Sequence, residues 1–330
     1  MAGEFALIER LLKQVAPANA DQAPGLILGP GDDCALIAPP AAGESWAITT
    51  DMLVEGTHFL GTDNPEDLGW KTLAVNLSDL AAMGARPRYV TLAVSLLATD
   101  ERTGWVDRFV TGFAACAKQY DVSLIGGDTT RGPRSFSVTA IGTVNPHQAL
   151  RRSGAQDQDD IWVSGNPGLA ALGLAHKLGT TPLPTRVAEC AAAALHHPQP
   201  RLALGQALVG LAHSCLDVSD GLLQDLGHIT QASGLAASLQ QTALPAVPDT
   251  VSASLWQQCL LGGGDDYELL FTAASNSRNQ LEKLSADLQV PLHRIGQMHT
   301  SNKTGTITLL DDQQNPIDLH DLRRGFDHFA

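Results

Sequence analysis

Seven aspartates lie where a loop is expected to meet a strand or a helix, and most of them stand next to glycine, serine or threonine. They are Asp32, Asp33, Asp51, Asp79, Asp128, Asp217 and Asp220. Hard cations such as Mg²⁺ prefer carboxylate and hydroxyl oxygens, and Mg²⁺ commonly bridges a protein to substrate phosphates. Glycine lets a ligand approach the backbone closely. The segments Gly31–Asp33, Thr49–Asp51 and Gly126–Asp128 therefore predict a site for several metal ions and a polyphosphate.

Each of these clusters has a structural explanation when it is taken alone. The Gly31–Asp33 segment could be a turn, and Asp217–Gly221 could be an Asx turn that caps the next helix. Asp79 could form a solvated surface pair with Asn76, one helical turn earlier. The recurrence of such clusters within one chain favours the metal site, because coincident turns explain it poorly.

The common motifs for nucleotide or nucleophilic chemistry are absent from the sequence. No P-loop is present, and Gly29-x-Gly31 lacks the third glycine of a dinucleotide fingerprint. The protein-kinase signatures, the HExxH motif and the Gly-x-Ser-x-Gly elbow are missing as well. If the chain handles ATP, it does so on a less common scaffold.

The charge of the chain restricts its partners. The 330 residues include 35 Asp and Glu against 21 Lys and Arg, a net charge of −14. Duplex nucleic acid and anionic membranes attract basic surfaces, so neither is expected as a partner. The seven aspartates supply half of the negative excess, which fits a protein that reaches small polyphosphates through cations.

The cysteines and the apolar runs indicate a cytoplasmic protein. The five cysteines form no Cys-x-x-Cys pair, so neither a zinc ribbon nor a disulfide framework is expected. Met1–Val15 has the spacing of an amphipathic helix and lacks the apolar core of a signal peptide. No apolar run approaches the ~18 residues of a membrane span.

Strands alternate with helices along the sequence, which predicts an α/β or α+β fold in two domains. A polar stretch over 145–160 separates the domains, which we predict to comprise residues 1–148 and 149–330. Strands are predicted over 46–54, 89–97, 122–125, 136–144, 161–164, 215–218 and 269–272, and helices over 65–83, 103–120, 188–195, 201–212 and 277–288. A helix is also predicted after Gly168 and another after Gly221, and two short strands are predicted after the last helix. Gly126–Gly132 is predicted to be a turn after a short strand.

Longer patterns cover nearly the whole chain, from Gly3-Glu-Phe5 to Gly325-Phe-Asp-His-Phe329. They are Gly31–Ala35, Thr49–Asp51 with His58-Phe59, Lys71–Ala85, Leu124–Gly132, Arg152–Gly154, Leu216–Leu222 and Gly263–Leu269. In these segments the chain closely resembles the bacterial thiamine-monophosphate kinase family, which belongs to the aminoimidazole-ribonucleotide synthetase-like superfamily.

The resemblance implies an activity and an architecture. The activity is ATP + thiamine monophosphate → ADP + thiamine diphosphate, with several Mg²⁺ ions as cofactor. The architecture is a two-domain α/β fold with the active site between the domains. The N-terminal domain would bind ATP and Mg²⁺ and would pair with its copy in a homodimer.

The resemblance also implies roles for individual residues. The implied metal ligands are Asp32, Asp33, Thr49, Thr50, Asp51, Asp79, Asp128, Asp217 and Asp220. The implied ATP contacts are Gly127, Asp128, Arg152 and Ser219, and the implied substrate contacts are His58, Glu268 and Phe326. Phe326 could stack on a heteroaromatic ring, and Glu268 could accept a hydrogen bond from an aminopyrimidine or face the thiazolium cation. Asp265 departs from the family, which usually has Glu there.

The expected chemistry is direct in-line transfer of the γ-phosphoryl group, with no covalent nucleophile and with Asp51 and Asp128 as the most critical residues. Two alternatives remain open at this point. One is an ATP-dependent synthetase of the same superfamily that acts on an amide or carbamoyl group. The other is a non-catalytic module that binds a magnesium nucleotide.

Overall fold

The computed structural model describes residues 25–28, 36–319 and 325. The chain divides into two compact units, Met1–Leu80 with Ala85–His147, and Ala81–Gly84 with Gln148–Ala330. The amphipathic helix predicted over the first residues lies outside the described part of the chain. Within the described ranges, no helix is long and apolar enough to cross a membrane.

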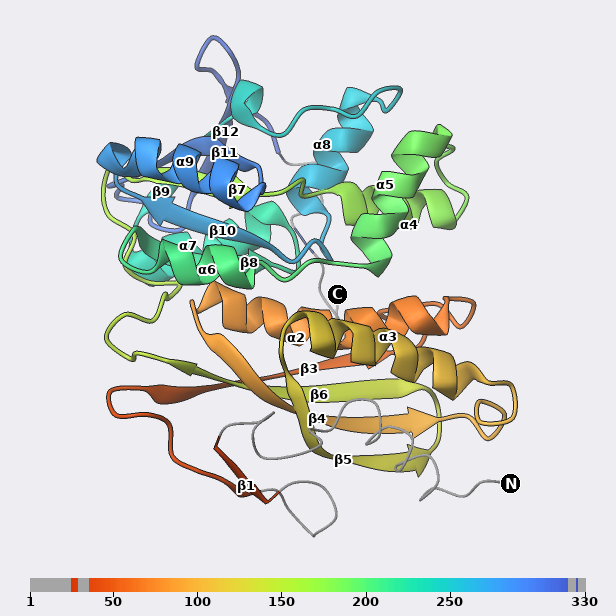
Figure 1. Ribbon diagram of the computed structural model, residues 1–330. Helices are drawn as coiled ribbons and strands as arrows, with labels where there is room; N and C mark the ends of the chain where they lie inside the picture. Colours follow the sequence, from red (N-terminus) through yellow and green to blue (C-terminus); the bar gives the residue numbers. More distant parts are fainter. Residues whose placement is uncertain (1–24, 29–35, 320–324, 326–330) are drawn as a thin grey trace. The chain divides into compact units, whose positions relative to one another are not determined.

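The first unit is built on a four-stranded sheet in the order β3-β6-β4-β5. The strands are β3 (Ser45–Val54), β4 (Arg86–Leu96), β5 (Ser123–Arg131) and β6 (Ser135–Val144). β6 pairs antiparallel with β3 and β4, whereas β5 pairs parallel with β4. Helices α2 (Pro65–Ala82) and α3 (Trp105–Gln119) lie on one face of this sheet (Figure 1).

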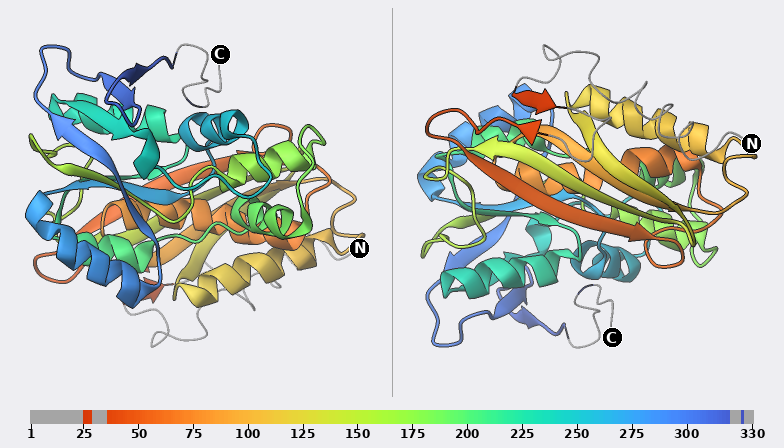
Figure 2. Two further views of the ribbon diagram at one scale, coloured as in Figure 1. Left: turned by 90° about the horizontal axis from the view of Figure 1, so that it is seen from above. Right: turned by 90° about the horizontal axis from the view of Figure 1, so that it is seen from below.

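The opposite face of the sheet has a smaller cover. Strands β1 (Leu26–Leu28) and β2 (Leu36–Ile37) form a two-stranded sheet, and Leu26 and Ile37 pack beside Tyr89 and Ile125. The right-hand view of Figure 2 looks onto the strands from this side. One face of the sheet therefore carries two long helices, and the other carries only the short β1–β2 pair among the described elements.

The sequence of α3 shows why this layer forms. Val106, Phe109, Val110 and Phe113 recur at helical spacing, and all four are buried. Phe109 stacks on Phe136 of β6 with the ring centroids 4.6 Å apart. Such aromatic pairs add to the hydrophobic free energy of burial, so they fasten the helix to the sheet.

Strand β5 is longer than the sequence predicts. The expected turn at Gly126–Gly132 is wrong, because β5 continues to Arg131. Its residues Gly127, Asp128 and Thr129 pair with Leu92, Ala93 and Val94 of β4. Glycine and aspartate disfavour strands on average, but pairing with a neighbouring strand overrides this local preference.

The second unit contains a seven-stranded sheet in the order β13-β12-β9-β11-β7-β10-β8. All its pairs are antiparallel except the parallel pair β9–β12. The strands are β7 (Asp160–Ser164), β8 (Ala212–Val218), β9 (Ala236–Gln240), β10 (Glu268–Ala273), β11 (Leu292–His299), β12 (Ile307–Leu310) and β13 (Pro316–Ile317). The helices are α4 (Leu169–Lys177), α5 (Thr185–His196), α6 (Leu202–Leu208), α7 (Leu222–Ser233), α8 (Ala253–Gly262) and α9 (Arg278–Leu288).

Helices cover both faces of this second sheet. Val163, Leu216 and Leu270 of neighbouring strands are buried in one core with Leu226 of α7 and Leu260 of α8. Figure 1 shows α6 and α9 on the other side, and α9 contacts both α6 and β11. The predicted α/β class is therefore confirmed in both units.

Strand β9 and helix α8 of the second unit are absent from the sequence-based prediction. Strand β9 has the sequence Ala-Ala-Ser-Leu-Gln, whose small and polar residues give a weak strand signal, and it is held by β11 and β12 on its two sides. Helix α8 is short, and Ser252 caps it by accepting a hydrogen bond from the backbone N–H of Leu255 at 3.3 Å.

A buried ion pair fixes the turns at one end of the first sheet. The Arg134 guanidinium donates to both carboxylate oxygens of Asp100, at 2.9 and 2.6 Å, and lies 4.6 Å above the centre of the Trp105 ring. The Asp100 side chain is only 1% exposed, and it also accepts from the backbone N–H of Leu97. Hydrogen bonding to Asp100 raises the pKa of Arg134, so the guanidinium keeps its charge.

We predict that Arg134→Met lowers the free energy of unfolding by about 3–5 kcal/mol, because it leaves the Asp100 carboxylate buried without its counter-ion. Urea denaturation measures this change. The matched control is Arg102→Met, an exposed arginine of the same turn region, which should change stability by about 0.5 kcal/mol or less. Equal losses in the two variants would contradict the role of the pair.

Candidate functional site

Strand β3 and helix α2 bring three predicted metal ligands together in the first unit. The Thr49 hydroxyl donates to Asp79 Oδ2 at 2.5 Å. The backbone N–H of Asp51 donates to Asn76 Oδ1 at 2.9 Å, so the two contacts join the same strand to the same helix. Thr49 and Asp51 are two residues apart in a strand and therefore point to the same face, toward α2.

The helix presents Asn76 and Asp79 one turn apart on the face that meets the strand. Asn76 is 1% exposed and donates from its amide to the carbonyl of Thr72, which fixes the orientation of the amide. The alternative of a solvated surface pair for Asn76 and Asp79 is therefore wrong. Thr50 lies on the opposite face of β3, where its hydroxyl is 2.9 Å from that of Thr139.

Gly127 and Asp128 lie on β5, at an edge of the same sheet. Asp128 is exposed, and its neighbour in β4 is the exposed Ala93. The backbone of Gly127 packs against the Leu92 carbonyl so closely that a Cβ atom would collide with its oxygen. Only glycine allows β5 to approach β4 at this point, and the position of Asp128 depends on that approach.

We predict that Gly127→Ala lowers the free energy of unfolding by about 1–3 kcal/mol, because a methyl group at this position forces β5 away from β4. The adjacent Gly126→Ala is the matched control, since its Cβ would have Thr91 Cγ2 as its nearest neighbour at 3.7 Å. Thermal denaturation should show no loss for Gly126→Ala. Similar losses in both variants would contradict the steric explanation.

His58 follows β3 in a turn of the first unit. Its Nδ1 accepts a hydrogen bond from the backbone N–H of Val54 at 3.0 Å. An accepting Nδ1 requires a neutral ring in this geometry, with the proton on Nε2. The structure thus gives His58 a fixed orientation, while its role as a substrate contact stays a prediction.

In the second unit, Asp217, Ser219 and Asp220 lie where β8 ends and α7 begins. Asp217 is buried within the strand, and Ser219 is exposed. Asp220 accepts a hydrogen bond from Gln224 Nε2 at 2.9 Å. The carbonyl of Ser219 accepts from the backbone N–H of Asp265 at 2.7 Å, which ties this loop to the segment before β10.

The buried carboxyl group of Asp225, in the first turn of α7, holds this loop in place. Asp225 Oδ2 accepts from the backbone N–H groups of Asp220 and Gly221, at 3.2 and 3.1 Å. Burial raises the pKa of Asp225 to about 7, the N–H of Gly221 lowers it, and the charge of Asp220 raises it further. Because burial disfavours the ionised form, this group costs stability as the pH rises from about 4 toward 7.

We predict that Asp225→Ala lowers the free energy of unfolding by about 1–3 kcal/mol, because two backbone donors lose their acceptor. Asp225→Asn keeps an acceptor oxygen and cannot ionise. Its stability relative to the wild type should therefore rise between pH 5 and pH 8, measured by urea denaturation in metal-free buffer. A difference that is constant with pH would contradict the burial of an ionisable group.

Arg152 lies on the segment that enters the second sheet. Arg152 is exposed, and the carbonyl of the preceding Arg151 accepts from the backbone N–H of Cys215 at 2.8 Å. Further along the segment, Asp159 faces His213 Nδ1 with both carboxylate oxygens, at 2.9 and 2.8 Å. These contacts anchor the segment to β8 and leave the Arg152 guanidinium accessible to an anion.

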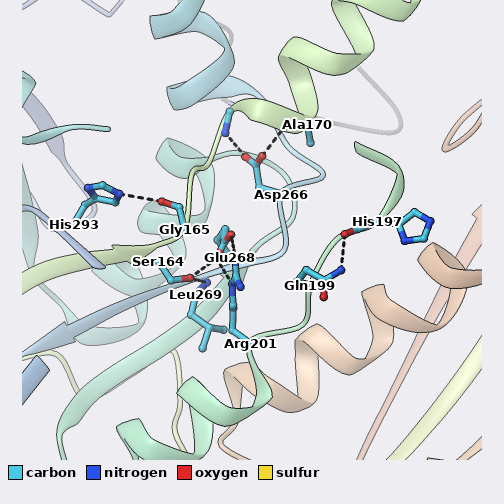
Figure 3. Close-up of polar contacts among 11 residues, drawn as sticks. Ser164, Gly165, Ala170, His197, Gln199, Arg201, Asp266, Glu268, Leu269 and His293 are labelled. Carbon is cyan, nitrogen blue, oxygen red and sulfur yellow. Dashed lines mark hydrogen bonds and ion pairs between the residues drawn. The ribbon is translucent and has the colours of Figure 1, made fainter. Parts of the chain in front are cut away.

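Glu268 begins β10 and is surrounded by donors (Figure 3). Arg201 donates to its two oxygens at 2.7 and 2.5 Å, and the Ser164 hydroxyl donates to Oε2 at 2.5 Å. The nearby Asp266 accepts from the backbone N–H groups of Gly168 and Ala170 at the start of α4. Burial raises the pKa of Asp266, while these two donors lower it.

Three predicted site residues, Asp32, Asp33 and Phe326, lie outside the described residues. Among residues 25–28, 36–319 and 325, no three His, Cys, Asp or Glu side chains gather as a ready metal site. The described oxygen donors, Thr49 with Asp79 and the nearby Asp51, nevertheless fit Mg²⁺. This ion usually takes only one or two protein carboxylates and completes its shell with water and substrate phosphate.

Comparison with known proteins identifies the family. The model of the AIR synthase related protein, N-terminal domain, matches residues 31–144. The thiamine-monophosphate kinase of Escherichia coli (strain K12) is 42% identical over 334 residues, which cover 99% of this chain and 98% of the relative. This chain belongs to the thiamine-monophosphate kinase family. The family member of Haemophilus influenzae is 41% identical over 331 residues, with the same coverage of both chains.

Solved structures agree with this assignment. Thiamine-monophosphate kinase from Stenotrophomonas maltophilia K279a has a TM-score of 0.83 at 45% identity, over 93% of this chain and 96% of that one. AaThiL complexed with AMPPCP and TMP has a TM-score of 0.73 at 25% identity, over 99% and 97%. Hydrogenase maturation protein HypE of E. coli shares the fold at 19% identity, with a TM-score of 0.76 over 98% of both chains. The predicted family and superfamily fold are confirmed.

Sequence reasoning assigned no role to Asn76, Asp225 and Arg201, although each holds a predicted site residue in place. Asn76 had a detectable signal, since it lies one helical turn before Asp79. Asp225 has the same kind of signal, because it follows Gly221 in the first turn of a helix. Arg201 has none, because its partner Glu268 is 67 residues further along the chain.

Proposed function

We propose that this protein transfers the γ-phosphoryl group of ATP to thiamine monophosphate and forms thiamine diphosphate and ADP. Full-length similarity supports this function, because the curated relatives with this name cover 99% of the chain. The single observation with the most weight is the match to AaThiL complexed with AMPPCP and TMP, which covers 99% of this chain. AMPPCP is an ATP analogue, so that complex contains both partners of a phosphoryl transfer.

The chemistry that we propose is direct and in line. An oxygen of the thiamine monophosphate phosphate forms a bond to the γ-phosphorus of ATP, while the bond from that phosphorus to the β-γ bridging oxygen breaks. The acceptor oxygen is already ionised near neutral pH, so the step requires no strong general base. The protein must hold two anions in contact and in the correct alignment, which reduces the entropic part of the barrier.

In this proposal, the residues of the chain divide these tasks. Gly127 and Asp128 on β5, together with Arg152 and Ser219, contact ATP. His58, Glu268 and Phe326 contact thiamine monophosphate. The anchored backbone next to Arg152 and the exposure of its side chain support its place at a phosphate oxygen, where a guanidinium donates two parallel hydrogen bonds.

Magnesium is the cofactor that we propose. The residues whose side chains would hold it, directly or through water, are Asp32, Asp33, Thr49, Asp51, Asp79, Asp128, Asp217 and Asp220. Thr50 is not part of this set, because its side chain points to the opposite face of β3. When bound, Mg²⁺ neutralises phosphate charge and stabilises the charge that develops in transfer. Thr49 and Asn76 support this role, because the Thr49 hydroxyl orients the Asp79 carboxylate and the Asn76 amide holds the backbone of Asp51.

A homodimer that forms through the first unit is also part of the proposal. On the face of β3 opposite α2, Ile48 is 64% exposed and Met52 is 53% exposed, with Thr50 between them. Exposed apolar side chains on a sheet face are typical of an interaction surface. Sedimentation equilibrium should give twice the monomer mass of 34.8 kDa, and a monomer at micromolar concentration would contradict this part.

The cytoplasm is the proposed location. The described cysteines, Cys116, Cys190, Cys215 and Cys259, are free thiols, which fits a reducing compartment. The proposed use of ATP fits the same compartment.

We predict that the purified protein forms thiamine diphosphate from ATP, Mg²⁺ and thiamine monophosphate, and that Asp51→Asn and Asp128→Asn reduce the rate at least about 100-fold. Each substitution removes a negative charge while it keeps the size of the side chain. Chromatography of the product measures the rate, and circular dichroism checks the fold.

The control is Asp121→Asn, an exposed carboxylate of the same unit with φ of 54°, a conformation that asparagine also adopts. It should turn over at the wild-type rate. Absence of thiamine diphosphate with concentrated wild-type enzyme would overturn the proposed function. Near-normal rates in Asp51→Asn and Asp128→Asn would overturn the proposed metal role of these residues.

A further inference from the structure

Arg201 reaches Glu268 from a rigid segment of the second unit. It follows Pro198-Gln-Pro200, in which both prolines are buried, and it directly precedes α6. Its Nε donates to Glu268 Oε2 at 2.7 Å, and its Nη2 donates to Oε1 at 2.5 Å. Figure 3 shows the Arg201 side chain directed toward the Glu268 carboxylate. The pair has no net charge, although Glu268 alone would be negative.

Ser164 completes the set of contacts around this carboxylate. Its hydroxyl accepts from the backbone N–H of Leu269 at 2.9 Å and donates to Glu268 Oε2 at 2.5 Å. On the other side, Oε1 lies against Gly165, where a Cβ atom would collide with it. Glycine at this position, with φ of 62°, therefore leaves the space that the carboxylate fills.

The number of acceptor positions on Glu268 limits what else it can bind. A carboxylate offers about four lone-pair positions, two on each oxygen. Among the described residues, Oε2 accepts from Arg201 and Ser164, whereas Oε1 accepts from Arg201 alone. One acceptor position on Oε1 is therefore used by no described residue.

We infer that Arg201 is a positioning residue, which orients Glu268 so that the pair offers thiamine monophosphate one hydrogen-bond acceptor and no net charge. This inference rests on the proposed function and on Glu268 as a substrate contact. The pair then recognises a single N–H donor, which the amino group of the pyrimidine ring supplies, and does not attract the thiazolium ring by charge. Of the two roles considered for Glu268, the hydrogen bond fits this geometry.

Steady-state kinetics of Arg201 and Glu268 variants test this inference. Arg201→Met should raise KM for thiamine monophosphate about tenfold or more, because Glu268 loses its two-pronged partner and keeps only the Ser164 hydroxyl. KM for ATP should stay within about twofold. In the Glu268→Gln background, Arg201→Met should have little further effect on KM, since its effect acts through Glu268.

Arg278→Met is the matched control, because Arg278 makes the same two-pronged contact with buried Asp160 at the other end of β7, at 2.6 and 2.7 Å. Both arginine variants are expected to lower the melting temperature, but Arg278→Met should leave both KM values unchanged. Arg201→Lys covers the case in which Arg201→Met does not fold. It keeps the charge, loses the two-pronged geometry and should raise KM for thiamine monophosphate alone.

A substrate analogue tests the hydrogen-bond donor itself. Thiamine monophosphate with an oxo group in place of the ring amine should show a KM at least about tenfold higher with the wild type. The inference is overturned by equal KM values for the two substrates, by an equal rise in both KM values in Arg201→Met, or by a wild-type KM in Arg201→Lys. A wild type that forms no thiamine diphosphate overturns the proposed function instead.

Discussion

Two hydrogen bonds between β3 and α2 determine where Asp51 and Asp79 of the first unit lie. The Thr49 hydroxyl binds the Asp79 carboxylate, and the backbone N–H of Asp51 binds the Asn76 amide. Because the Asn76 contact uses the backbone N–H of Asp51, it sets the position of this residue relative to α2. These contacts require the helix layer to be held against the sheet. Aromatic packing contributes to this, because Phe109 of α3, the second helix of the layer, stacks on Phe136 of the same sheet.

The same principle recurs in the second unit with different residues. Asp225 holds the backbone of Asp220 and Gly221, and Arg201 holds the carboxylate of Glu268. In each case a buried polar group is satisfied by a second residue that is itself fixed by the fold. A site for two anions requires this arrangement, because carboxylates that were free to rotate would bind cations weakly and would not align the phosphates.

The sequence predicts the residues of the candidate site better than it predicts the contacts among them. The spacing of Asn76 and Asp79 places them on one face of a helix, and the alternation of Thr49 and Asp51 places them on one face of a strand. That these two faces meet depends on packing between segments 25 or more residues apart, which no local pattern encodes. The resemblance to the family supplied the site residues, and the structure supplied their partners.

Strand β5 is a segment for which local sequence preference predicts the wrong structure. Gly126–Gly132 has the composition of a turn, and local preference alone predicts one. The segment is extended because β4 pairs with it, and Gly127 permits an approach that any side chain would prevent. The partnership of Arg201 and Glu268 was equally invisible, since two residues so far apart in sequence meet only in the folded sheet.

The most direct test of this account is a crystal structure of the protein grown with Mn²⁺ and a non-hydrolysable ATP analogue, in which anomalous scattering locates the metal. We expect anomalous peaks about 2.0–2.3 Å from carboxylate oxygens of Asp51 and Asp79, because Mn²⁺ occupies Mg²⁺ sites built from oxygen donors. A fully occupied nucleotide site with no anomalous peak near Asp51 or Asp79 would contradict the account.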